Sequence, residues 1–79
     1  MVYFRAWYRK NNESGALDAN FPDWVVHAID EEEARAKVLE SMNRPEPEKG
    51  FNVLLLPIED EDEGTMAFAS ARQNGQALL

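Results

Sequence analysis

Five consecutive acidic residues, Glu59 to Glu63, separate two apolar stretches near the end of this 79-residue chain. Like charges at this density repel one another and resist burial, so the segment must project into solvent. The stretches on either side, 51–58 and 65–71, have the length and apolar character of strands. The acidic segment is therefore expected to be a turn between two strands, and it offers a concentrated negative field to any cationic molecule.

Length and composition indicate one small domain that lacks the residues of many common sites. A domain of this size buries only about 60% of the surface that its unfolded chain exposes, so its stability is marginal. Because there is no cysteine, disulfides, thiol catalysis and cysteine-ligated zinc are excluded. The longest uncharged apolar stretch, Val53 to Ile58, is far shorter than the ~20 residues of a membrane helix. No secretory signal precedes the first strand, so we expect a soluble, cytoplasmic protein.

Residues 2–9 alternate with the period of two that is typical of a strand. One face carries Val2, Phe4, Ala6 and Tyr8, and the other carries Tyr3, Arg5, Trp7 and Arg9. A polar loop over 10–20 leads to a second predicted strand, 21–29. Pro22 lacks an amide hydrogen, which suits the beginning of a strand or a sheet edge.

A helix is predicted to follow the second strand. Asp30 with Glu33 three residues later is a capping-box arrangement, and it starts a helix that continues to about Asn43. Its apolar positions fall on one stripe, as expected of a helix that lies on a sheet: Ala34, Val38, Leu39 and Met42. Prolines at 45 and 47 then end the helix. The almost wholly apolar segment 51–58 is typical of a central strand covered on both faces.

These elements predict an α+β fold in which one helix packs on a four-stranded antiparallel sheet. The domain is expected to span 1–71, in the order strand, strand, helix, strand, strand, and 72–79 is expected to be a tail. Antiparallel pairing throughout gives the spatial order 2-1-3-4. One helix covers one sheet face, so the face with Tyr3, Arg5 and Trp7 needs another cover. The tail, the stems of the arginines, a second copy of the chain and a foreign partner are the alternatives.

Neither catalysis nor direct nucleic-acid binding is favoured. His27 is the sole histidine and has no relay partner, and no nucleophile elbow, Gly-rich phosphate loop or calcium-loop spacing occurs. We expect no enzymatic activity, no cofactor and no metal. The formal net charge of −7 repels nucleic acid at long range. The aromatic and basic side chains of the first strand are similar to those of RNA-binding sheets, but the RNP pattern is missing.

Acidic residues also gather at the predicted helix start, over 31–33. Each acidic cluster has an ordinary explanation, because charged turns prevent aggregation and acids in the first helical turn interact favourably with the helix dipole. Together they form spaced carboxylates that resemble phosphates, by which a protein can occupy a nucleic-acid-binding groove. The residues expected to contact such a partner are Glu31, Glu32, Glu59, Asp60, Glu61, Asp62 and Glu63.

The segment 24–38, WVVHAIDEEEARAKV, resembles the strand–cap–helix unit of many small phage-encoded proteins, including anti-CRISPR proteins that inhibit type I systems. The resemblance implies a protein that binds a CRISPR effector complex and blocks the recognition or cleavage of target DNA. Two other classes remain open. An immunity protein or antitoxin would cap a basic enzyme, and a homodimeric structural or regulatory module would use the apolar sheet face.

Overall fold

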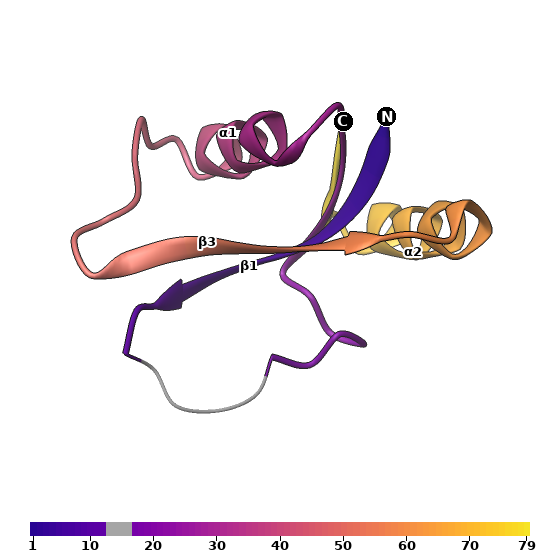
Figure 1. Ribbon diagram of the computed structural model, residues 1–79, viewed down its shortest axis with the longest axis horizontal. Coiled ribbons are helices and arrows are strands. Elements are labelled where there is room, and N and C mark those ends of the chain that lie inside the picture. The colour runs from indigo at the N-terminus through magenta and orange to yellow at the C-terminus, as the bar shows by residue number, and fades with distance from the viewer. Residues whose placement is uncertain (13–16) are drawn as a thin grey trace.

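The computed structural model describes residues 1–12 and 17–79, and it contains one sheet and two helices (Figure 1). The elements in chain order are β1 (Val2–Lys10), β2 (Trp24–Ala28), α1 (Glu31–Ser41), β3 (Phe51–Ile58), α2 (Glu61–Gln73) and β4 (Ala77–Leu78). The predicted α+β class and the four-stranded sheet are confirmed. Within the described residues, neither helix is long and apolar enough to span a bilayer.

The sheet has the order β3-β1-β2-β4, and it is mixed rather than wholly antiparallel. β1 pairs antiparallel with both β2 and β3, as the sequence predicts. The prediction is wrong about the fourth strand. β4 pairs in parallel with β2 instead of lying beside β3, so β3 becomes an edge strand and the pair β1 and β2 occupies the centre.

The largest error of the sequence prediction is the missing second helix, α2. Residues 59–63 are not a hairpin turn, and 65–71 is not a strand, because Asp60 caps a helix that runs to Gln73. Its buried residues Gly64, Phe68 and Ala71 follow the spacing of one helical face. The expected tail, 72–79, contains the end of α2 and the whole of β4. Gly75, with a φ of 73°, makes the reversal between them.

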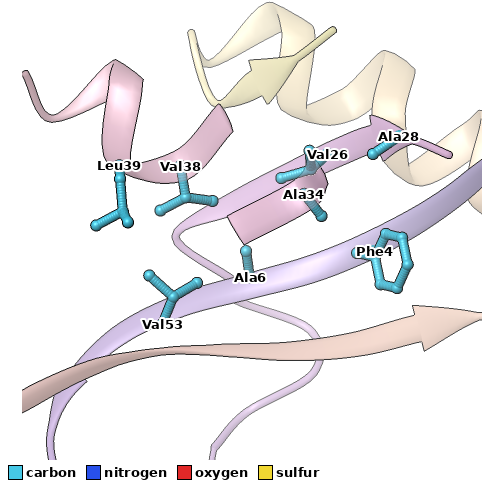
Figure 2. Packing of buried hydrophobic residues seen from close by; sticks show 8 residues of the cluster. All are labelled: Phe4, Ala6, Val26, Ala28, Ala34, Val38, Leu39 and Val53. Carbon is cyan, nitrogen blue, oxygen red and sulfur yellow. The ribbon is translucent and has the colours of Figure 1, made fainter. Parts of the chain in front are cut away.

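The two helices cover opposite faces of the sheet. α1 packs on the face that carries Phe4, Ala6, Val26 and Ala28, where its own Ala34, Val38 and Leu39 complete a buried cluster with Val53 (Figure 2). α2 packs on the other face, where Phe68 and Ala71 contact Val25 and Ile58. Because side chains alternate across a strand, neighbouring residues of β2 serve the two separate cores.

Candidate functional site

Both acidic segments lie at the same end of the sheet, on its two faces. Tyr3 pairs with His27 on one side and with Ile58 on the other, so these two partners are about 10 Å apart, twice the spacing of neighbouring strands. The helix cap Asp30 follows His27 by three residues, and the cap Asp60 follows Ile58 by two. In Figure 1, α1 begins at its right-hand end above the sheet, and α2 begins at the far right, beyond the end of β3. We call this region, residues 30–33 and 59–63, the acidic end.

The start of α1 uses two of its carboxylates to hold the helix. Asp30 Oδ1 accepts a hydrogen bond from the N–H of Glu33 at 2.9 Å. Glu33 Oε1 in turn accepts from the N–H of Ile29 at 3.1 Å and lies 3.1 Å from Nζ of Lys37. The hydrogen bond from Ile29, and then the one from Lys37, lower the pKa of Glu33 below its ordinary value. Glu33 is therefore ionised at neutral pH, and its carboxylate stabilises the start of α1.

The start of α2 repeats this arrangement with a different cation. Asp60 Oδ1 accepts from the N–H groups of Asp62 and Glu63 at 2.9 and 3.2 Å. Glu63 Oε1 accepts from Nη2 of Arg5 at 2.9 Å, which ties the first turn of α2 to the sheet. The remaining acidic side chains of the acidic end make no hydrogen bond or ion pair within the described residues, and they are exposed: Glu31, Glu32, Glu59, Glu61 and Asp62.

Apolar side chains are exposed beside these carboxylates. Ile29 directly precedes the cap of α1 and is 65% exposed, and Val2, which pairs with Ala28, is 36% exposed. Protein interfaces commonly combine an apolar centre with a charged or polar rim. The acidic end has both components.

The face with Tyr3, Arg5 and Trp7 is not an open interface. Tyr3 lies under α2, where its ring stacks on His27 with centroids 4.2 Å apart and meets Phe68 at 5.5 Å. Trp7 is only 2% exposed. The helix α2 covers Tyr3, and Trp7 is buried, so neither side chain is open to a second copy or a partner.

The outer edge of β3 is largely closed to a further strand. Backbone groups along an antiparallel strand alternate between facing the paired strand and facing away. Val53 donates its outward N–H to Oδ1 of Asn52 at 2.9 Å, and its carbonyl accepts from Nη2 of Arg35 at 3.4 Å. Pro57 has no N–H to offer. Within 53–57, only Leu55 then has both its outward N–H and its outward carbonyl unpaired. One such residue is too little for the stable addition of another strand.

The acidic end is a surface of carboxylates. Across residues 1–12 and 17–79, no group of three or more histidine, cysteine, aspartate or glutamate side chains is arranged to hold a metal ion. His27 is occupied in the aromatic stack with Tyr3. No protein-family model, curated protein or solved structure matches the chain. The function must therefore be inferred from its surfaces.

Proposed function

We propose that this chain is a non-enzymatic inhibitor whose acidic end occupies the basic, nucleic-acid-binding surface of a partner protein. The observation that carries the proposal is that two acidic helix starts lie at the same end of the sheet, one on each face. Negative charge is therefore presented on both faces at this end of the domain. A basic groove that binds phosphates is complementary to such a surface.

The exposed Ile29 and Val2 favour a binding role over a purely solubilising one. A surface that only maintains solubility gains nothing from apolar side chains among its charges. An interface gains free energy from them, because burial of apolar area adds to the charge attraction. The burial of Trp7 and the largely blocked β3 edge favour this proposal over a homodimeric module that uses the sheet.

The narrowest form of the proposal names a type I CRISPR effector complex as the target, in the cytoplasm of a bacterial host. It is supported by the resemblance of 24–38 to small phage-encoded inhibitors. The acidic end would take the place of target DNA, so DNA recognition would be lost without any chemical change to the complex. An immunity protein would act through the same surface on a basic toxic enzyme.

The test measures the binding of target DNA to a purified type I effector complex as the chain is added. The most informative variant is Glu31→Gln/Glu32→Gln/Glu61→Gln, which removes three carboxylates that hold no cap. The matched control is Glu40→Gln/Glu46→Gln/Glu48→Gln, which removes the same net charge from exposed positions elsewhere.

We expect the wild-type chain and the control to displace DNA, and the first variant to inhibit much more weakly. Inhibition should also fall with added salt, since exposed charges are screened over about 8–10 Å near physiological ionic strength. Equal inhibition by both variants would show that the acidic end is not the contact surface. No effect of the wild-type chain on DNA binding would refute the CRISPR target itself.

A further inference from the structure

A cleft of about 480 Å³ opens on the α2 side of the sheet. It lies between the second half of α2 and the segment 17–23, which runs below the sheet on the side away from α1 in Figure 1. The volume falls within the range of ~300–1,000 Å³ that is usual for small-molecule sites. The cleft adjoins the acidic end through Arg5, which binds Glu63, but none of the residues 30–33 and 59–63 lines it.

The lining of the cleft combines apolar surface with one cation. Val25, Ala67 and Ala71 contribute apolar area, and the ring of Phe21 stands at its margin with 75% of its surface exposed. Arg5 also lines the cleft, although its side chain is only 16% exposed. A large exposed ring such as that of Phe21 and a largely buried guanidinium such as that of Arg5 are seldom found together in one open cleft.

Several N–H donors of the Arg5 guanidinium make no hydrogen bond within the described residues. Within the described residues, its one hydrogen-bond partner is Glu63, which engages Nη2 alone. No buried side-chain nitrogen lacks a partner in this part of the chain, so the remaining nitrogens of Arg5 contact solvent. Asp23, the one acidic residue of the cleft lining, is already neutralised by Arg9 at 2.6 Å. Both charged residues of the lining are thus in ion pairs, and what the cleft offers an anionic ligand is the remaining N–H donors of Arg5.

We propose that this cleft binds a small carboxylic acid with a flat apolar body. The carboxylate would accept charge-assisted hydrogen bonds from the N–H groups of Arg5 that Glu63 does not engage. The apolar body would lie on Val25 and Ala71 against the ring of Phe21. The amide side chains of Asn20, Asn74 and Gln76 supply further hydrogen bonds at the rim.

The probe is phenylacetate, titrated into the ¹⁵N-labelled full chain while amide and arginine Nε–H signals are followed by NMR. Phenylacetamide, of the same shape without the charge, is the matched ligand. We expect saturable shifts around Ser70, Asn74 and Arg5 with phenylacetate, and affinity at least about tenfold weaker for phenylacetamide, because a hydrogen bond to a charged group is lost.

Three variants and one charge-matched control separate the contributions. Arg5→Met should weaken phenylacetate binding by about tenfold or more, whereas Arg44→Met, an equal charge change on the α1 side, should leave it unchanged. Glu63→Gln should strengthen binding, because it frees Arg5 from its competing carboxylate. Ser70→Leu fills the cleft without altering Arg5, and it should abolish binding even if Arg5→Met does not fold.

The proposal is overturned if phenylacetate gives no saturable shift at the cleft, if the two ligands bind equally, or if Ser70→Leu binds as the wild type does.

Discussion

Gly64 lies against the side chain of Tyr3 where α2 packs on the sheet, and its replacement by alanine tests whether this contact fixes the position of the helix. At an exposed helical position, changing glycine to alanine stabilises a protein by about 1 kcal/mol. At Gly64 the added Cβ would lie 2.6 Å from Cδ2 and 2.9 Å from Cγ of Tyr3. Carbon atoms in contact prefer about 3.5–4.0 Å. The Tyr3 ring cannot easily give way, because it stacks on His27 and contacts Phe68.

Overpacking of this kind costs about 1–3 kcal/mol. Offset by the gain in helix propensity, Gly64→Ala should lower the free energy of unfolding by about 1 kcal/mol. Ala69→Gly at an exposed position of the same helix is the control, and it should cost about 1 kcal/mol through propensity alone. In a Tyr3→Ala background only the Cβ of residue 3 remains close, at 3.0 Å, so Gly64→Ala should become neutral or stabilising.

Urea unfolding followed by circular dichroism measures all of these variants. The close packing of α2 on β1 would be refuted if Gly64→Ala stabilises the wild-type chain. It would also be refuted if the substitution has the same effect with and without the Tyr3 ring. A coupling energy of about 1–3 kcal/mol between the two positions would support it.

Three further predictions concern the cap of α2, the ion pair of α1 and the free edge of β3. Asp60→Ala should lower the free energy of unfolding by about 1 kcal/mol in urea titrations, and an unchanged value would contradict the capping role. Glu33→Gln should lower Tm at neutral pH, and this loss should shrink as the pH falls below about 4.3 and through the lowered pKa of Glu33, because the carboxylate stabilises the fold only while it is ionised in the folded chain; a loss of Tm that is as large at about pH 2 as at pH 7 would contradict this. Asn52→Ala/Pro57→Thr should restore outward N–H groups to β3 and cause association that light scattering detects; particles that stay the size of the wild type would exclude edge protection.

The parts of the fold that sequence could predict are those that local signals determine. Asp30 and Glu33 marked the start of α1 because capping depends on residues three apart. The alternation over 2–9 marked β1, and the apolar run before Ile58 marked β3. The placement of β1 between β2 and β3 followed from the direction of α1 across the sheet. None of these inferences needed long-range information.

The helix α2 was missed although its signals were present. Asp60 and Glu63 repeat the spacing of Asp30 and Glu33, and Gly64, Phe68 and Ala71 have helical spacing. Over so short a segment an apolar run also fits a strand, and the density of acids before it favoured a turn. The position of β4 beside β2 could not be predicted, since two residues carry too little pattern. Without α2, the cleft at Arg5 was not predictable either, because its lining comes from several separate segments.

The acidic end contains more negative charge than the fold requires. Four carboxylates have structural partners: Asp30 and Asp60 accept from helix N–H groups, Glu33 binds Lys37, and Glu63 binds Arg5. The other five gain only the attraction of the helix dipole, about 0.3–1 kcal/mol each, and they repel one another. One or two acidic residues at each helix start would provide most of the stabilisation that the helix dipole offers. The surplus lies where two helices begin at one end of the sheet, and it is the reason for proposing a cationic partner.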